Sequence, residues 1–574
     1  MPEYLSPGVY MEEFESGGRP MEGVSTSTAG FLGLAERGAI EGLPELVTNF
    51  GDFQRKFGSY LSENAFGDYR FLAYAVEHFF INGGSRCFVM RVAPPDAKTS
   101  SNFTDKDQPV LAISAKNPGI WGDKIRIIAI PASKAKTPIF EVIDGAHYKV
   151  KNNAGFFPGD VIAFDDGEYL QYRTVLKSQD NEITLSGALE GDVVDKAMLP
   201  SRTMTTCDFT LQVFYEGDSE IYEKVSLNPA APNFVEKRVA KSNLINIKVN
   251  LPADTEDSTP IEIISGEEGK DAHWIYLFGG SDGSVASLSA ADFLGEDRGP
   301  GKRTGIQAFI DNDVVSLMAV PGVVDPNVQL GLVAHCENLT SRFAVLDIPR
   351  DKKKVSDVES HRNIFDSHYA ALYHPWLQVF DPLDKRNIYI PPSGSVVGIY
   401  ARSDNTRGVH KAPANEVVRA CVGLDCQYNK GEQDILNPKG VNLIRFFPGQ
   451  GIRVWGARTC SSNSLWRYVN VRRLFVFVEQ SIKNGSSWVV FEPNDEALWA
   501  RVSRTIYSFL MGVWRSGALM GTTQDEAFFI KCDRSTMSQD DIDNGRLICV
   551  IGIAPVKPAE FVIFRITQKT RDSE

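Results

Sequence analysis

Residues 279–283 read Gly-Gly-Ser-Asp-Gly and match G-x-S-x-G, a pattern in which a serine on a sharp turn acts as a nucleophile. A strand-like run precedes the pattern and a helix-like run, residues 285–293, follows it, which is the context that such a nucleophile needs. Histidines that could act as the general base come later: His335, His361, His368, His374 and His410. Asp-Gly is itself a turn signal. The pattern leaves two alternatives, a hydrolase-like enzyme using Ser281 and a structural turn, and the turn is favoured.

Other residues that could hold a cofactor or a metal do not complete a known site. The segment Gly299–Lys302 lacks both the Ser or Thr after the lysine and the upstream glycine of a phosphate-binding loop. His361 and His368 could share a helix face, but two histidines alone do not make a zinc site. The eight cysteines form no C-x-x-C, and only Cys421 and Cys426 are close in sequence, which favours a reduced compartment. We expect no catalytic residue, no cofactor and no metal.

One stretch, residues 441–520, has a charge balance opposite to that of the chain, whose formal net charge is −13. It holds ten Lys or Arg and four acids, a local net charge of about +6. This asymmetry predicts an acidic partner surface, with a solvated basic face as the alternative. Nothing alternates basic and aromatic residues as nucleic-acid modules do, so a protein partner is favoured. The basic residues are Arg445, Arg453, Arg458, Arg467, Arg472, Arg473, Lys483, Arg501, Arg504 and Arg515.

Both ends of the chain look extended. Residues 4–14 carry a Pro-Gly turn and lead into a loose Ser/Gly/Pro segment, residues 16–20. After Pro558, residues 561–568 alternate like a strand, with Val562, Phe564 and Ile566 on one face and Phe561 and Ile563 on the other. Such a strand can pair within its own chain or with a neighbour's sheet edge. The sequence alone favours pairing within the chain.

The composition indicates a globular protein of several domains. The chain has 574 residues, of which 43% are hydrophobic and 23% charged. No apolar run approaches the length of about 18 residues that a membrane span needs. The N-terminus shows neither the basic start nor the apolar core of a signal peptide.

The hydrophobic pattern predicts both helices and strands. A strand-like run at 25–34 is followed by a helix at 69–82 and a buried strand at 87–92. Residues 96–205 show short alternating runs between turn signals and read as an all-β insertion. Strand candidates at 274–278, 314–320, 343–347 and 370–373 alternate with helix-length segments, which indicates an α/β layer.

The strongest single element is a helix over residues 495–516. Asn494 is the expected N-cap, and Gly517 is expected to end the helix. Leu498, Val502, Ile506, Phe509 and Val513 form its apolar stripe. The helix has several arginines and no acid after its first turn, so it could dock on an acidic surface.

Several stretches resemble, in the same order, recurrent sequences of contractile tail sheath proteins, which occur in contractile phage tails and phage-tail-like injection systems. They are YLSPGVY from residue 4, AKNPGIWGD from 115, LFGGSDG from 277, RFAVLD from 342, PPSGSVVGIYAR from 391, DNTRGVHKAPAN from 404, and the C-terminal stretch from 440 to 568. The resemblance is weakest from about residue 96 to 260. His410 stands where many members have an aromatic residue.

The resemblance and the patterns together predict an α+β / α/β multidomain fold. A conserved sheath core is expected from the N- and C-terminal parts, with an α/β layer and a β-rich outer insertion. The predicted divisions are an N-terminal extended arm (1–22), the first part of the sheath core (23–95), the outer insertion (96–205), an α/β sheath domain (206–400), a C-terminal core domain facing an inner tube (401–557), and a C-terminal arm strand and tail (558–574).

The resemblance implies a structural, non-enzymatic role as a subunit of a contractile tail sheath. Such subunits polymerise as stacked rings around an inner tube and contract from a metastable extended state, driving the tube through a target envelope. The implied partners are further copies of the chain in a helical homo-oligomer with hexameric rings, the inner tube protein, and baseplate and tail-terminator or cap proteins. Neither nucleic-acid binding nor membrane insertion is expected. Assembly is expected in the cytoplasm of a bacterial host, followed by retention or release by lysis.

Two sets of residues are expected to make the contacts. The arm strands that join neighbouring subunits would contain Val9, Tyr10, Met11, Phe561, Val562, Ile563, Phe564, Arg565 and Ile566. The contact with the inner tube would use Arg501, Arg504 and Arg515.

Overall fold

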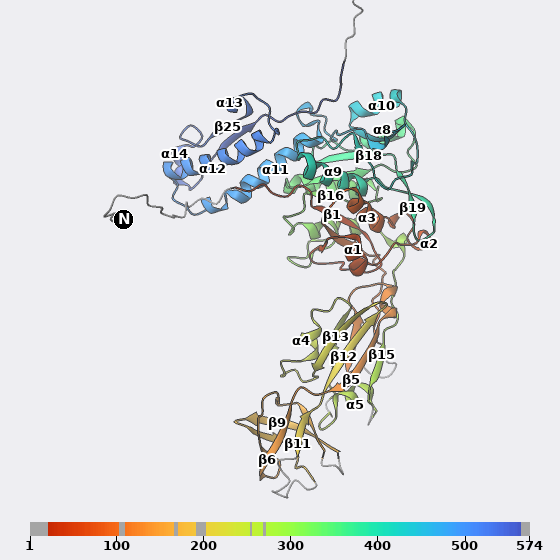
Figure 1. Cartoon of the computed structure of the whole chain (residues 1–574), viewed down its shortest axis with the longest axis vertical. Coiled ribbons are helices and arrows are strands. Elements are labelled where there is room, and N and C mark those ends of the chain that lie inside the picture. Colours follow the sequence, from red (N-terminus) through yellow and green to blue (C-terminus); the bar gives the residue numbers. More distant parts are fainter. Residues whose placement is uncertain are drawn as a thin grey trace, which may run out of the picture.

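A computed structural model describes most of the chain. The described residues are 21–102, 109–165, 170–190, 202–252, 255–267 and 271–563. They form an elongated molecule with a body at one end, a β-rich module extending from the body, and a helical domain beside the body (Figure 1).

The body is built around a mixed sheet, which has nine strands within the described residues. In spatial order they are β2 (Glu45–Val47), β3 (Cys87–Val92), β1 (Ala29–Leu34), β16 (Leu317–Ala319), β17 (Phe343–Asp347), β18 (Ala370–His374), β23 (Val441–Phe447), β24 (Gly451–Val454) and β21 (Glu416–Val417). The strands from β3 to β23 run parallel, while β2, β24 and β21 are antiparallel to their neighbours. Two distant parts of the sequence therefore share one sheet.

Helices cover both faces of this sheet, and the strand side chains alternate between two buried cores. In β17, Phe343 and Val345 face one core, whereas Ala344 and Leu346 face the other. The first core is covered by α1 (Phe50–Phe57), α3 (Leu72–Asn82) and α9 (Ser393–Arg407). The second is covered by α6 (Ala290–Leu294), α7 (Pro326–Leu339), α8 (Val355–Arg362) and α10 (Lys430–Leu436). Parallel strands that are buried on both faces read as almost continuous apolar runs, as these do.

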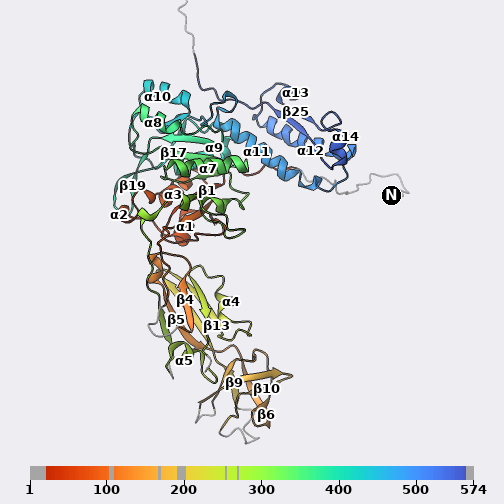
Figure 2. The same cartoon turned by 180° about the vertical axis from the view of Figure 1, so that it is seen from behind.

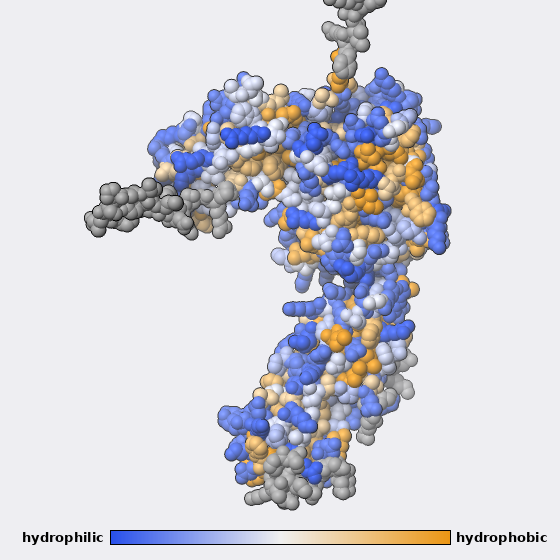
Figure 3. All heavy atoms as spheres, in the orientation of Figure 1, coloured by the Kyte–Doolittle hydropathy of each residue, from blue (hydrophilic) through white to orange (hydrophobic). Residues whose placement is uncertain are grey.

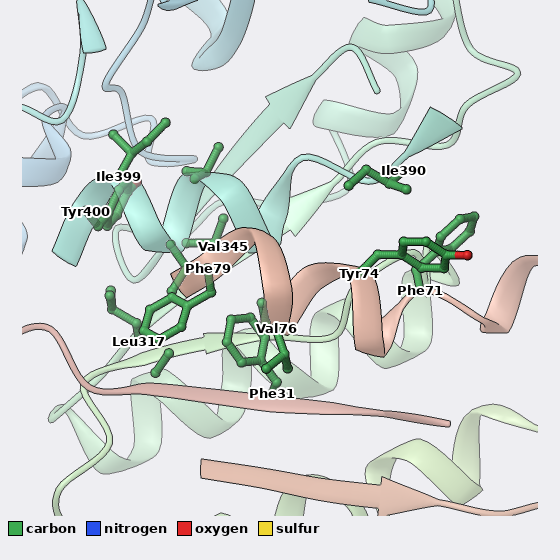
Figure 4. Packing of buried hydrophobic residues seen from close by; sticks show 14 of the residues in the cluster. Phe31, Phe71, Tyr74, Val76, Phe79, Leu317, Val345, Ile390, Ile399 and Tyr400 are labelled. Carbon is green, nitrogen blue, oxygen red and sulfur yellow. The ribbon is translucent and has the colours of Figure 1, made fainter. Parts of the chain in front are cut away.

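The helices α3 and α9 approach each other through glycines. A Cβ added at Gly394 would lie 2.5 Å from the Cα of Ala75, and one added at Gly398 would lie 2.5 Å from the carbonyl oxygen of Phe79. The same α3 reaches the sheet on its other side, where the rings of Phe79 and Phe31 meet edge to face with centroids 5.5 Å apart (Figure 4). The glycines thus let two helices and a sheet share one closely packed layer.

The β-rich module contains two packed parts (Figure 2). Nearer the body is a sheet of β13 (Asp218–Val225), β12 (Asp208–Tyr215), β5 (Arg126–Ala132) and β15 (His273–Tyr276), with the pair β4 (Leu111–Ala115) and β14 (Ile245–Val249) and the helices α4 (Val235–Val239) and α5 (Pro260–Ser265). At the far end is a closed barrel of β10 (Glu182–Leu185), β7 (His147–Val150), β6 (Lys136–Asp144), β11 (Thr203–Thr206), β8 (Val161–Asp165) and β9 (Leu170–Gln179).

The predicted division at residue 205 falls inside this module. Strand β12 pairs with every residue of β5, and β15 pairs with the opposite edge of β5. The module therefore continues to about residue 280, and the strand at 273–276 belongs to it rather than to the sheet of the body. Local sequence patterns cannot show this, because the partner strand lies more than 140 residues earlier in the chain.

A neck of two chain segments joins the module to the body, and Figure 3 shows a narrow waist there. The backbones of Lys98 and Ser281 exchange two hydrogen bonds, each 2.9 Å long. The carboxylate of Asp96 accepts hydrogen bonds from Ser284 N at 3.1 Å and from Ser287 Oγ at 2.7 Å. The chain therefore leaves the body and returns to it at the same place.

The C-terminal domain contains α11 (Val469–Gly485), α12 (Glu496–Arg515), α13 (Gln524–Ala527) and α14 (Gln539–Asp543), with the antiparallel pair β25 (Phe528–Lys531) and β26 (Val550–Ile553). The predicted helix over 495–516 is confirmed as α12; Leu498, Val502, Ile506 and Val513 of its predicted stripe are buried, and Phe509 is partly buried. The predicted N-cap is wrong by one residue, because the side chain of Asp495, not of Asn494, accepts the hydrogen bond from Leu498 N. Asn494 instead accepts a hydrogen bond from the indole of Trp499 at 2.8 Å.

In the described range the body also contains a three-stranded sheet and a short helix. The sheet has the order β20 (Arg386–Ile390), β19 (Leu377–Asp381) and β22 (Gly423–Leu424), and the helix is α2 (Glu63–Phe66). The strands predicted at 87–92, 343–347 and 370–373 are confirmed as β3, β17 and β18. The helix predicted at 69–82 is confirmed as α3, with a 3-10 turn before it. The chain is thus a mixed α/β protein.

Candidate functional site

The G-x-S-x-G pattern forms a turn in the neck. Ser281 Oγ accepts a hydrogen bond from Gly283 N at 3.1 Å, and Asp282 Oδ1 accepts one from Ile120 N at 3.0 Å. The next element is a three-residue 3-10 helix, Val285–Ser287, rather than the long helix that follows a nucleophile elbow. This geometry is that of a structural turn, and it gives the hydrolase alternative no support.

Neither a metal site nor a membrane-spanning helix is found in the described part of the chain. In the described ranges, no group of three or more His, Cys, Asp or Glu side chains is arranged to hold a metal ion. Across those same ranges, no helix combines the length and the apolar character that crossing a membrane would require. The features that remain are surfaces and chain ends of the C-terminal domain.

The first described residues of the chain lie along α11. Val24 N donates a hydrogen bond to Ser481 Oγ at 3.1 Å. Thr26 Oγ1 donates to Asp404 Oδ2 at 2.7 Å, and the guanidinium of Arg473 donates to the carbonyl of Thr26 at 2.9 Å. Arg473 and Asp404 also form an ion pair of 2.5 Å in which both side chains are 4% exposed. The chain is therefore fixed at residues 24–26, directly after the predicted N-terminal arm (1–22).

A second anchor holds the other end of the chain. The carboxylate of Glu560 accepts hydrogen bonds from Arg458 Nη2 at 2.5 Å and Nε at 2.9 Å. It also accepts one from Asn437 Nδ2 at 2.7 Å and one from Tyr468 OH at 3.2 Å. Burial alone would raise the pKa of Glu560, but the hydrogen bonds from Arg458 and Asn437 outweigh it, so the pKa lies below its usual value. The carboxylate therefore stays ionised and holds the chain at this point.

Helix α11 contacts both terminal segments close to these anchors. Ser481, near the end of α11, holds Val24, and Asn470, near its start, donates a hydrogen bond to the carbonyl of Val556 at 3.3 Å. Eleven residues separate the two contacts, which corresponds to about 16 Å along an α-helix. The two chain ends thus leave the domain at separate, fixed places.

Beyond Glu560, the residues predicted for the C-terminal arm lose contact with the domain. Phe561, Val562 and Ile563 are 73%, 69% and 79% exposed and belong to no strand. For these three residues, the pairing within the chain that the sequence favours is not found. The other predicted arm residues lie outside the described part of the chain: Val9, Tyr10, Met11, Phe564, Arg565 and Ile566.

The three arginines predicted to contact a partner are brought together on α12. At about 100° per residue, Arg501, Arg504 and Arg515 lie within an arc of roughly 60°, on the side opposite the buried stripe. All three are exposed. Arg501 pairs with Glu492 at 3.1 Å, and its guanidinium lies over the ring of Trp488. We call this surface the arginine face.

Three of the other basic residues counted in the sequence contribute little to the surface. The side chains of Arg458, Arg472 and Arg473 are 6%, 4% and 4% exposed, and each is paired with a carboxylate of the same chain. The local charge of residues 441–520 therefore overstates the positive surface of the domain, because sequence counts cannot separate internal ion pairs from exposed charge.

The strands β25 and β26 form a short sheet with unpaired outer edges. In the described part of the chain, each strand of four residues pairs only with the other. Their exposed faces carry apolar side chains, because Phe529 is 51% exposed and Val550 is 44% exposed. A short sheet with free backbone edges and an exposed apolar face can accept a further strand.

The anchor of the C-terminal segment was not expected from the sequence. A signal was nevertheless present, since Glu560 is the one acid between Asp543 and Asp572, in a stretch that is otherwise apolar, basic or rich in proline. An isolated acid beside an apolar strand needs a buried partner. That partner, Arg458, lies about 100 residues earlier and could not be identified from spacing.

Comparisons with known proteins assign the body and the C-terminal domain to one class. The phage tail sheath protein central domain matches residues 299–460, and the phage tail sheath C-terminal domain matches residues 461–569. The chain belongs to the contractile tail sheath family and is a tail sheath subunit. This assignment confirms the resemblance seen in the sequence motifs.

Relatives and solved structures agree with this assignment. The tail sheath protein of Escherichia phage P2 is 23% identical over 337 residues, covering 56% of this chain and 81% of the phage protein. The fold is similar to that of the PVC sheath of an extracellular contractile injection system in its contracted state, with a TM-score of 0.52, 20% identity and 99% coverage of both chains. It is also similar to a sheath tail protein from Listeria innocua, with a TM-score of 0.51, 12% identity and coverage of 94% of this chain and 96% of that one.

Proposed function

We propose that this sheath subunit polymerises into a helical array of stacked hexameric rings around an inner tube, and that its terminal arms join neighbouring subunits. The observation that carries the proposal is the layout of the C-terminal domain. The apolar segment 561–563 leaves it with exposed side chains, while β25 and β26 keep open edges within the described residues. A chain that offers both a strand and a sheet edge can pair with copies of itself. Because the donor and acceptor surfaces differ, the contact builds open filaments rather than closed dimers.

In this proposal the donors are the strands around Val9–Met11 and around 561–566, and the acceptor is the β25–β26 sheet. An isolated pair of short strands is marginally stable, so a neighbour's strand would complete it. Main-chain pairing through extended connections lets subunits rotate and slide without separating. The anchors at Val24 and Glu560 set where the connections begin.

The arginine face is the proposed contact with the inner tube. Its three guanidinium groups are exposed, and α12 presents no acid after its first turn. One exposed ion pair contributes only about 0–1 kcal/mol. Such a contact can break during contraction, whereas its repetition over many subunits keeps the extended sheath aligned with the tube.

Contraction itself would be a one-way release of stored free energy. The extended array is metastable in this proposal and is held by a kinetic barrier until contraction drives the tube through a target envelope. The β-rich module would lie on the outside of the array, where its size does not disturb the arm contacts. The ends of the array would bind a baseplate and a tail-terminator or cap protein, and assembly would take place in the bacterial cytoplasm.

Electron microscopy of truncated chains tests the arm contacts. We expect the full chain to form hollow tubes of fixed diameter and a chain ending at Glu560 to remain as discrete particles. Because a chain ending at Glu560 keeps the anchor, a loss of tubes would be caused by the missing arm and not by a damaged domain. Tubes of unchanged diameter from the truncated chain would contradict the proposal.

A matched pair of substitutions sharpens this test without shortening the chain. Val562→Pro removes a backbone donor and prevents regular pairing, whereas Val562→Ala keeps the backbone and changes only the side chain. We expect tubes with alanine and none with proline. Equal assembly of the two variants would show that residue 562 does not pair as a strand.

A further inference from the structure

The C-terminal domain brings two cysteines together that are far apart in sequence. Lys531 of β25 is paired with Val550 of β26, so the next pair in the antiparallel register is Cys532 with Cys549. Both cysteines belong to the same hydrophobic cluster, Cys532 being buried and Cys549 partly exposed, and both are free thiols. Their side chains interact with each other directly.

The type of pair decides whether a disulfide can form. Ala554 N donates to the carbonyl of Ala527 at 2.9 Å, so residues 527 and 554 are a hydrogen-bonded pair. Because hydrogen-bonded and non-hydrogen-bonded pairs alternate along an antiparallel ladder, the pair Cys532–Cys549, five steps further, is non-hydrogen-bonded. Cα atoms in such pairs are about 4.5 Å apart, within the range of about 4.4–6.8 Å that a disulfide spans.

We propose that Cys532 and Cys549 form a cross-strand disulfide that closes the β25–β26 hairpin once the protein meets an oxidising environment. In a reducing cytoplasm the two residues remain thiols. The oxidant is a low-molecular-weight disulfide. The thiolate of Cys549, the more exposed of the two, attacks one sulfur of this disulfide and releases one small thiol. The thiolate of Cys532 then attacks the sulfur of Cys549 and releases the second small thiol. The two protein thiols lose two protons and two electrons, and the small disulfide is reduced to two thiols.

The reaction is expected to be slow but selective. Burial raises the pKa of both thiols, that of Cys549 to about 12, so little thiolate is present near neutral pH. The close pair in sequence, Cys421 and Cys426, has different partners, because Cys421 donates to the carbonyl of Gly423 and Cys426 Sγ lies 3.7 Å from the imidazole of His374. These two cysteines are therefore an internal control in the same chain.

The linkage is tested by peptide mapping of the full chain. The reduced protein is incubated with oxidised glutathione, its free thiols are alkylated, and it is digested without reduction. We expect a peptide linking Cys532 to Cys549, with both alkylated in the untreated sample and Cys421 and Cys426 alkylated in both samples. Full alkylation of Cys532 and Cys549 after treatment, or their linkage to other chains, would overturn the proposal.

A cysteine variant provides a second test of the disulfide in case the linked peptide is not detected. In Cys532→Ser the resolving thiol is absent, so we expect glutathione to stay attached to Cys549, whereas it does not accumulate there in the natural sequence. Absence of the adduct in Cys532→Ser would overturn the proposed order of attack. If Cys532→Ser does not fold, Cys549→Ser serves instead, and we expect it to leave Cys532 free and fully alkylated after denaturation.

The effect of the disulfide on assembly rests on the proposed function, in which β25 and β26 accept a neighbour's strand. There the linked hairpin would exchange its backbone amides more slowly and bind the arm in a fixed geometry. Peptide mapping reports the disulfide whether or not tubes form. A linked peptide without tubes would therefore contradict the proposed function alone, and tubes without a linked peptide would contradict the disulfide alone.

Discussion

The guanidinium of Arg458 and the carboxylate of Glu560 meet at 2.5 Å, with the arginine side chain 6% exposed and the glutamate 19% exposed. Removing the acid leaves a buried, unpaired cation, which costs more than the loss of an exposed pair. We expect Glu560→Gln to lower the free energy of unfolding by about 2–3 kcal/mol. Limited proteolysis should then cleave near residues 556–560, because the chain is no longer held there.

The control for this variant is an exposed pair elsewhere in the chain. Glu296 and Arg298 are 2.7 Å apart, and both side chains are more than half exposed. Glu296→Gln should change stability by less than about 1 kcal/mol and leave the proteolysis pattern unchanged. Equal effects of the two substitutions would show that Glu560 does not anchor the chain end.

Reversing the charge of the arginine face should affect assembly and leave folding intact. With Arg501, Arg504 and Arg515 all changed to Glu, we expect tube-dependent assembly to be lost, since three attractions become repulsions. The thermal midpoint of the free subunit should stay nearly constant, because these residues are exposed. Arg534→Glu, at a side chain that is 68% exposed in the same domain, is the control. Assembly of the triple variant around the inner tube would refute the proposed contact.

Acid should destabilise the folded subunit between about pH 6.5 and pH 4. Burial lowers the pKa of four histidines, to about 3 for His335 and His374 and to about 4 for His78 and His361. The unfolded chain protonates these groups near pH 6.5 while the folded chain does not, so stability falls as the pH falls through this window. Each histidine contributes about 1.4 kcal/mol per pH unit.

One buried acid acts in the opposite direction. Burial raises the pKa of Asp347 to about 6, so the folded chain keeps this proton where the unfolded chain has lost it, and this group favours the folded state as the pH falls from about 6 to about 4. This one acid offsets the effect of one of the four histidines, so the net effect of lowering the pH is still a loss of folding stability. Urea unfolding at pH 7 and at pH 5 measures this loss of stability. Equal urea midpoints at the two pH values would contradict the prediction.

Two helical glycines should respond in opposite ways to the same substitution. In Gly398→Ala the new Cβ would lie 2.5 Å from a backbone oxygen of α3, so we expect a loss of about 1–3 kcal/mol. In Gly512→Ala, in α12, no atom lies within 4 Å of the new Cβ, so we expect a gain of roughly 0.5–1 kcal/mol from helix propensity. Thermal unfolding of the two variants measures whether each substitution raises or lowers folding stability. A destabilised Gly512→Ala would show that this face of α12 is already covered in the folded subunit.

Local periodicity was sufficient to predict the elements whose burial is set by their own sequence. The stripe of α12 and the apolar runs of β17 and β18 were identified correctly, because a buried face imposes a fixed spacing. The three arginines of α12 were separated from its stripe by the same argument. Pairing over long distances was not predictable: β15 resembles a core strand of an α/β sheet, yet its partner is β5.

The positions of the arginines likewise could be predicted from the sequence only in part. The exposed arginines of α12 and the buried Arg472 and Arg473 of α11 look alike in the sequence, since all lie in amphipathic helices. What distinguishes them is burial: the side chains of Arg472 and Arg473 are 4% exposed and pair with Glu479 and Asp404, whereas that of Arg501 is 53% exposed although it pairs with Glu492. Only the folded chain shows which cations are buried.

The two-stranded neck makes the module a unit that can be exchanged. The chain leaves and re-enters the body at residues paired with each other, Lys98 and Ser281, and the module's core is separate from the two cores of the body. A foreign domain whose own termini lie close together could be grafted between these two residues without cutting the nine-stranded sheet. The neck is therefore a site at which a cargo or recognition domain can be added to the subunit without altering the two cores of the body.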